Sequence, residues 1–228
     1  MKMSNCLFCI SFLLWATCAS GQRLSQVSFS NGSNLSFFSV LTDQGVQIRI
    51  SEDGKVLEWG TEVMSDRSNY YAPKLQPFLA RTEYFDAGSD PLFSGKVKSI
   101  GATFITYYGS SETVHKKGKL KSIGSLQFDY FSDFDDKSMQ GKIKLVGTNN
   151  LEFYRAYENE SFRGKLKSIG NMPITYYSTF DDKYNAGKIK SIASVPYQWY
   201  SNFDGYAKGG LKSNNYRQLI GSITFILR

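Results

Sequence analysis

Three kinds of side chain that can bind or react recur at regular spacing in this sequence: lysine, tyrosine and aspartate. One row of lysines has a spacing of 23 residues and consists of Lys98, Lys121, Lys144, Lys167 and Lys190. An aromatic row has the same spacing and consists of Tyr108, Phe131, Tyr154, Tyr177 and Tyr200. Ammonium groups attract acidic polymers, and a tyrosine ring offers an apolar face on which a sugar can stack. The two rows therefore predict a binding surface, although such rings can equally pack across strands and cover the lysine stems.

Adjacent carboxylates form the third recurrent set, as in Phe134-Asp135-Asp136 and Phe180-Asp181-Asp182. Paired carboxylates can bind a divalent cation or act as the acid and base of a glycosidase. Aspartate is also favoured in turns for backbone reasons. Because the set recurs in successive repeats and no copy stands apart, we expect a turn role, with no catalytic residue, no metal-binding residue and no cofactor. The alternative is a secreted enzyme that acts on a polysaccharide through one Asp pair.

A repeat of 23 residues positions all of these side chains. Its copies begin at Gly95, Gly118, Gly141, Gly164 and Gly187, each followed by lysine, and a looser copy begins at Gly209, 22 residues on. A fixed period of this length indicates a repeat architecture. We number the positions of each repeat from this glycine as position 0, so that the first lysine row lies at position 3 and the aromatic row at position 13.

The pattern within a repeat predicts a β-hairpin. Position 2 is apolar, positions 10 and 12 are apolar or aromatic, and position 11 is polar, which is the alternation of two half-buried strands. Position 6 is glycine in four of these copies and Ala193 in the fifth. A three-residue turn over positions 6–8 would pair position 2 with 12 and position 3 with 11, and a one-residue slip would exchange the faces. We therefore predict that turn, with a bulge where the apolar residue at position 5 has the wrong parity for the core.

The predicted fold is all-β: tandem 23-residue β-hairpin repeats form an elongated, twisted antiparallel sheet, with a β-solenoid as the alternative. The Gly-Lys openings, the aromatic strands and the period resemble MORN-type and YD-type β-hairpin repeat proteins over about residues 95–228. The chain has Phe-Asp-Asp-Lys where the YD type has Tyr-Asp-x-x-Gly, and it lacks the Tyr-x-Gly-x-x-x-Gly-Lys core of the MORN type. The resemblance implies a hairpin array that presents a surface, and it implies no catalytic residue.

Residues 1–21 have the composition of an export signal peptide. Lys2 precedes an uncharged apolar run over residues 6–16, and small residues follow up to Gly21. The run is too short to span a bilayer, so we expect cleavage after Gly21 and no transmembrane segment in the mature chain. All three cysteines lie in this segment, and Cys18 leaves a lipid anchor as the alternative. Residues 22–78 are predicted to form an N-terminal β cap, and residues 79–228 the repeat array.

Charge narrows the choice of partner. Loss of Lys2 from the 27 basic residues leaves 26 against 20 acidic ones, a net charge of +6 with the signs interspersed. This balance permits attraction to acidic glycans and does not indicate nucleic acid. The sequence therefore predicts a secreted or cell-envelope protein with a non-enzymatic binding or structural role, whose partner is an acidic glycan or another surface protein.

Overall fold

The computed structural model describes residues 21–63, 74–205, 207–212 and 215–228. The expected signal peptide lies outside the described residues, except for Gly21. The described residues contain eighteen strands and no helix, and they form two sheets. The predicted all-β class is confirmed.

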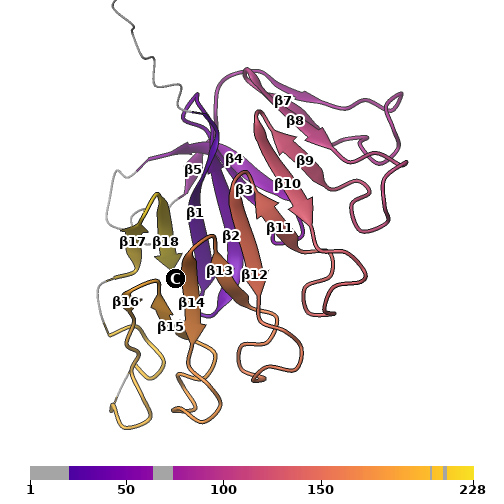
Figure 1. The fold of residues 1–228 in the computed structure, drawn as a ribbon. Coiled ribbons are helices and arrows are strands. Elements are labelled where there is room, and N and C mark those ends of the chain that lie inside the picture. The colour runs from indigo at the N-terminus through magenta and orange to yellow at the C-terminus, as the bar shows by residue number, and fades with distance from the viewer. Residues whose placement is uncertain (1–20, 64–73, 206, 213–214) are drawn as a thin grey trace, which may run out of the picture.

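The repeats form one antiparallel sheet in which strands that follow one another along the chain are neighbours (Figure 1). The predicted array of tandem hairpins is therefore confirmed, and the described strands do not stack as a solenoid would. The strands of this array sheet are β6 (Thr82–Tyr84), β7 (Val97–Ile100), β8 (Thr103–Tyr107), β9 (Leu120–Ile123), β10 (Leu126–Tyr130), β11 (Ile143–Val146), β12 (Asn149–Phe153), β13 (Leu166–Ile169), β14 (Met172–Tyr176), β15 (Ile189–Ile192) and β16 (Val195–Pro196).

The second sheet combines the two ends of the described chain, in the order β17-β18-β1-β2-β3-β4-β5. Its strands are β1 (Arg23–Ser30), β2 (Asn34–Leu41), β3 (Gln47–Ile50), β4 (Val56–Glu62), β5 (Leu75–Gln76), β17 (Arg217–Ile220) and β18 (Ile223–Leu227). Strand β18 pairs with β1 in parallel, whereas the other neighbours are antiparallel. The expected boundary between residues 78 and 79 separates β5 from β6, but the two sheets do not follow it at the end of the chain. The hairpin β17–β18, which follows the looser copy at Gly209, joins the N-terminal strands.

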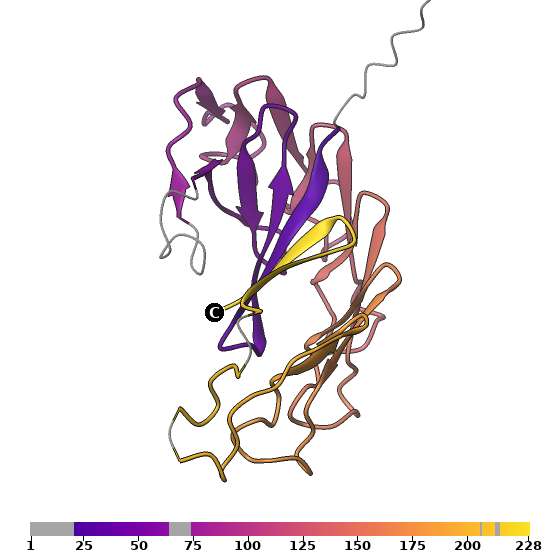
Figure 2. The ribbon, with the colours of Figure 1, turned by 90° about the vertical axis from the view of Figure 1, so that its left-hand side faces the viewer.

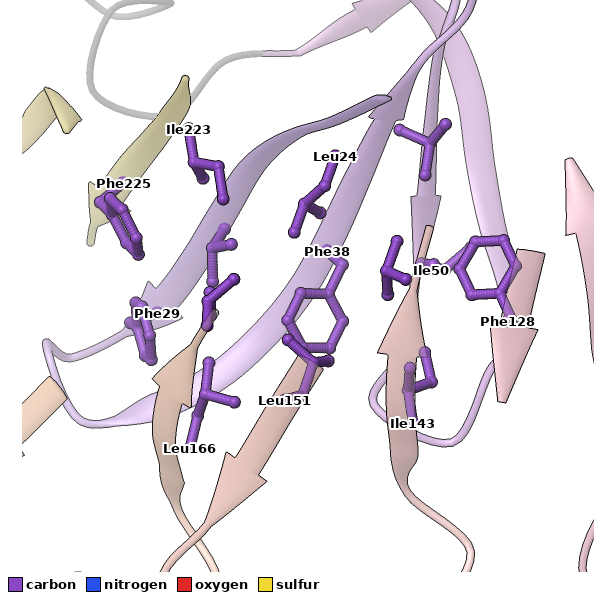
Figure 3. Close-up of a cluster of buried hydrophobic side chains, with 14 of the residues drawn as sticks. Leu24, Phe29, Phe38, Ile50, Phe128, Ile143, Leu151, Leu166, Ile223 and Phe225 are labelled. Carbon is purple, nitrogen blue, oxygen red and sulfur yellow. The ribbon is translucent and has the colours of Figure 1, made fainter. Parts of the chain in front are cut away.

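The two sheets lie face to face as two layers (Figure 2) and share one hydrophobic core. In Figure 3, Phe38 and Ile50 of the second sheet point toward Leu151 and Ile143 of the array. All four side chains are buried. Burying a side chain of this size contributes about 1.5–3 kcal/mol. The array is therefore one layer of a sandwich, and the N-terminal strands cover its apolar face.

The turn inside each repeat has two residues, so the predicted three-residue turn is wrong. Ser99 pairs with Phe104 and Ile100 with Thr103, which joins position 4 to 9 and position 5 to 8. Gly101 has a φ of 57°, and the residue after it is not in the left-handed region. A positive φ at the first central residue alone is the geometry of a type II′ hairpin turn. Ala193, the one non-glycine at this position, has a φ of 50°.

The bulge lies at position 3 rather than at position 5. Between β8 and β9, Thr106 pairs with Ser122 and Tyr107 with Leu120, so Lys121 is the extra residue. The same shift recurs in the other four pairings between successive hairpins. An extra residue changes the parity of the strand, and positions 2 and 5 therefore both face the core. The predicted register was wrong because it assumed that side chains alternate between the two faces without interruption along the strand.

Candidate binding surface

The five lysines of position 3 lie on the outer face of the array, turned away from the second sheet by the bulge. Lys98, Lys121, Lys144 and Lys190 are exposed. Lys167 is partly covered and forms an ion pair with Glu158 at 3.3 Å. Within the described parts of the chain, the other four lysines form no ion pair. The charges of these four lysines are available to a ligand.

The aromatic row of position 13 lies beneath these ammonium groups. Nζ of Lys121 is 5.6 Å from the ring centroid of Tyr108, and Nζ of Lys190 is 5.4 Å from that of Tyr177. The hydroxyl of Tyr108 donates a hydrogen bond of 2.8 Å to the carbonyl oxygen of Phe128 in the next repeat. The same link recurs at Tyr154 and Tyr177, and burial raises the pKa of all three tyrosines. Tyr200 lies under the ammonium of Lys212 at 5.3 Å.

The predicted lysines and tyrosines are therefore brought together, but the tyrosines connect repeats. The hydroxyls of Tyr108, Tyr154 and Tyr177 have partners in the next repeat, and a lysine lies over each of these rings. The packing role that the sequence left open is the one that these contacts support. Most lysines of this surface are exposed, whereas its tyrosines are half-buried.

A second row of lysines, at position 1, makes contacts within the fold. Nζ of Lys142 donates to the carbonyl oxygen of Gly164 at 2.6 Å and lies 4.7 Å from the ring centroid of Phe153. The corresponding lysines, Lys96, Lys119 and Lys165, make the same bond to the opening glycine of the next repeat. Burial lowers the pKa of Lys165 to about 8. These lysines join successive repeats to one another.

The adjacent carboxylates shape the loops between hairpins. Oδ2 of Asp135 accepts hydrogen bonds from the main-chain N–H and the hydroxyl of Ser132 at 2.6 and 2.8 Å. Oδ1 of Asp136 accepts from the hydroxyl of Ser138 at 2.7 Å and from the N–H of Ala156, in the next loop, at 3.0 Å. These bonds lower the pKa of both carboxyls. A general acid of a glycosidase needs a raised pKa, so the geometry supports the turn role.

The described residues contain no group of three or more His, Cys, Asp or Glu side chains that could hold a metal ion. They likewise contain no helix with the length and apolarity needed to cross a membrane.

One recurrent group was not identified as a candidate from the sequence: the aromatic residue at position 16, which lies in the inter-hairpin loop of four successive repeats. Phe134, Phe180 and Phe203 are 101%, 94% and 94% exposed, and Tyr157 is 77% exposed. Large apolar side chains that are exposed together mark interaction sites. The available signal was an aromatic residue that recurs inside a polar turn, where neither strand alternation nor turn chemistry requires one.

The lysine row and the loop aromatics meet in a cleft of about 410 Å³ between the second and third inter-hairpin loops of the array. Lys167 lines it together with Phe134, Glu152 and Arg155. A site of this composition offers an apolar ring beside both signs of charge. It suits a polar ligand with apolar faces, such as a sugar.

Comparison with protein-family models, with curated proteins and with solved structures found no match to this chain. The resemblance to MORN-type and YD-type repeats therefore stays a prediction, and the assignment of function depends on the geometry of the surface described above.

Proposed function

We propose that this protein is an exported, non-enzymatic binding protein whose ligand is an acidic glycan. The ligand lies along the outer face of the array, on the lysines of position 3 and the loop aromatics of position 16. One observation carries the proposal: four of the five position-3 lysines and the four loop aromatics are exposed, whereas the other recurrent side chains that we followed have partners within the fold.

Repetition gives the surface its affinity. Equivalent strands are two places apart in the meander, which separates equivalent side chains by about 9.6 Å if neighbouring strands are about 4.8 Å apart. Each exposed ammonium group contributes little by itself, since contacts between solvated charges are worth about 0.2–1 kcal/mol. An extended polyanion contacts several such groups at once, and linked contacts combine into a much higher avidity.

Acidic residues on the same face favour a glycan of moderate charge over a dense polyanion. Asp129 and Glu152 lie at position 11 of the outer face, and Asp129 is paired with Lys116 at 2.6 Å. A nucleic acid, with a charge on every phosphate, would be repelled by these carboxylates. A uronic-acid polymer has one carboxylate on each sugar, so its charges are more widely spaced than those of a nucleic-acid duplex, and it also offers apolar sugar faces to Phe134 and Phe180.

Binding of polygalacturonate to immobilised full-length protein tests the proposal, with neutral dextran as the reference ligand. The variant Lys121→Gln/Lys144→Gln should weaken binding about 3- to 10-fold at low salt and should flatten its salt dependence. The control Arg23→Gln/Lys74→Gln removes the same charge from two exposed residues, one in β1 and one just before β5, and should leave binding within about 2-fold. Equal losses in the two variants would show that only net charge matters.

The loop aromatics are tested separately. Phe134→Ala/Phe180→Ala should weaken binding while the salt dependence is retained, because a ring carries no net charge. Both side chains are exposed, so their removal should change stability by less than about 0.5 kcal/mol. Release of new reducing ends by the wild type, lost in Asp181→Asn/Asp182→Asn, would instead identify the protein as an enzyme.

A further inference from the structure

A larger cleft, of about 680 Å³, lies between the two sheets at the end where the array begins (β4, β7 and β8 in Figure 1). Its interior is apolar and is formed by Val56 and Trp59 of β4 and by Tyr84, Val97 and Tyr107 of the array. The rings of Trp59 and Tyr84 lie 6.5 Å apart. A concave, largely apolar site of this volume can enclose a small molecule.

The polar residues around this interior are mostly basic. Lys55, Lys96, Lys117 and Lys119 line the cleft, against a single carboxylate, Asp53. That carboxylate is already paired with Lys55 at 2.9 Å. The charge of the cleft therefore favours an anion, and its apolar interior favours an apolar body attached to that anion.

The position-1 lysines have different partners at the cleft from those elsewhere along the array. Where the sheets lie close together, the second sheet supplies oxygen partners: Lys142 contacts Glu52 at 3.4 Å, Lys165 contacts the hydroxyl of Ser33 at 2.5 Å, and Lys188 contacts the carbonyl of Asn31 at 2.9 Å. The position-1 lysines that line the cleft are Lys96 and Lys119.

Lys96 and Lys119 bond only to a glycine carbonyl of the next repeat and lie over an aromatic ring, as far as the described residues show. Neither forms an ion pair with a described residue. Burial lowers the pKa of each, so both ammonium groups are desolvated without a counter-charge in contact. An anion in the cleft would occupy the place that Glu52 has beside Lys142.

We propose that this cleft binds an amphipathic organic anion, with its apolar body against Trp59, Tyr84 and Val56 and its anionic group beside Lys96 and Lys119. The site is separate from the outer face of the array and does not depend on glycan binding. The repeat supplies the lysines, and the divergence of the two sheets supplies the space.

Titration of the full-length protein with decanoate, below its micelle concentration, tests the proposal by calorimetry and by tryptophan fluorescence. Decyltrimethylammonium has the same tail and the opposite charge, and decanol has the tail alone. Decanoate should bind at least about tenfold more tightly than the cation, and its binding should change the emission of Trp59. The same emission change in Trp59→Phe would place the ligand elsewhere.

Two variants separate the cleft from general surface effects. Val56→Phe fills the cleft and should weaken decanoate binding at least about tenfold, whereas Leu57→Phe, at the neighbouring exposed position that does not line the cleft, should leave it unchanged. Lys55→Gln/Lys117→Gln changes exposed residues without disturbing the links between repeats and should weaken it about 3- to 10-fold. Failure of decanoate to bind at millimolar concentration, equal binding of the cation, or equal effects of the two phenylalanine variants would overturn the proposal.

Discussion

A reciprocal exchange of glycine and alanine at two equivalent turns tests the hairpin geometry directly. Gly170 and Ala193 occupy the first central position of the two-residue turn in successive repeats, with φ of 54° and 50°. We consider Gly170→Ala and Ala193→Gly, each alone. A Cβ atom at residue 170 would have Asn149 Oδ1 as its nearest neighbour, at 3.7 Å, so the first substitution creates no clash.

The expected change in the free energy of unfolding is the difference between two opposing effects. A left-handed backbone costs an alanine about 1–2 kcal/mol. Alanine also lowers the conformational entropy of the unfolded chain, which stabilises the protein by about 0.4–1 kcal/mol relative to glycine. Gly170→Ala should therefore lower the free energy of unfolding by about 0.5–1 kcal/mol, and Ala193→Gly should raise it by a similar amount.

Urea unfolding followed by far-UV circular dichroism measures both changes. With a slope of about 2–3 kcal/mol/M, the midpoints should move by about 0.3 M in opposite directions. Gly147→Ala provides a steric contrast, since its Cβ would lie 2.5 Å from Cδ1 of the buried Leu126 and should add about 1–3 kcal/mol of destabilisation. A loss of stability in Ala193→Gly would refute the assignment of strain to this turn.

Three further predictions concern a pKa, the core and the chain start. Because the folded pKa of Lys165 is about 8 and its ordinary value is 10.5, the unfolded chain binds more protons between these pH values, and stability should rise with pH across that window. Between pH 8 and pH 10, the free energy of unfolding measured with urea should increase by about 1–2 kcal/mol more in the wild type than in Lys165→Met, after a discount for solvent screening. Equal increases in the two proteins would contradict this. Tyr176→Ala should cost about 3–5 kcal/mol and Lys190→Ala less than about 0.5 kcal/mol by the same assay, and equal costs would contradict the burial of position 12. N-terminal sequencing of protein recovered from the host envelope or medium should begin at Gln22, whereas an intact Met1 in cytoplasmic protein would exclude export.

Local repetition was sufficient to predict the hairpin array. The apolar side chains at positions 2, 10 and 12 face the core as expected, and Tyr176 and Trp199 are each 6% exposed. The same argument could not predict the second sheet. Residues 22–78 were predicted only to form an N-terminal β cap, yet Val27 of β1 pairs with Phe225 of β18, from the far end of the chain. Pairing between segments so distant in sequence leaves no periodic signal.

The error in register had an identifiable source. Ile100, Ile123 and Ile169 at position 5 are buried although their parity is wrong for a continuous strand. An apolar residue kept at such a position in successive repeats means that the parity changes between positions 2 and 5. The sequence contained that signal, and it required a bulge before position 5 together with a two-residue turn after it.

The bulge also decides which lysines a ligand can reach. Positions 1 and 3 are two residues apart, which in a regular strand would place both side chains on one face. Lys142, at position 1, instead bonds to the carbonyl oxygen of Gly164, whereas Lys144, the extra residue of the bulge, remains exposed on the outer face. The lysines of positions 1 and 3 thus have the same periodicity but different roles, and only the strand register distinguishes the two rows. In a repeat protein a recurrent residue is evidence for binding once the fold has been shown not to require it, and this criterion selects Lys144 and Phe134 while it sets aside Tyr154 and Asp135.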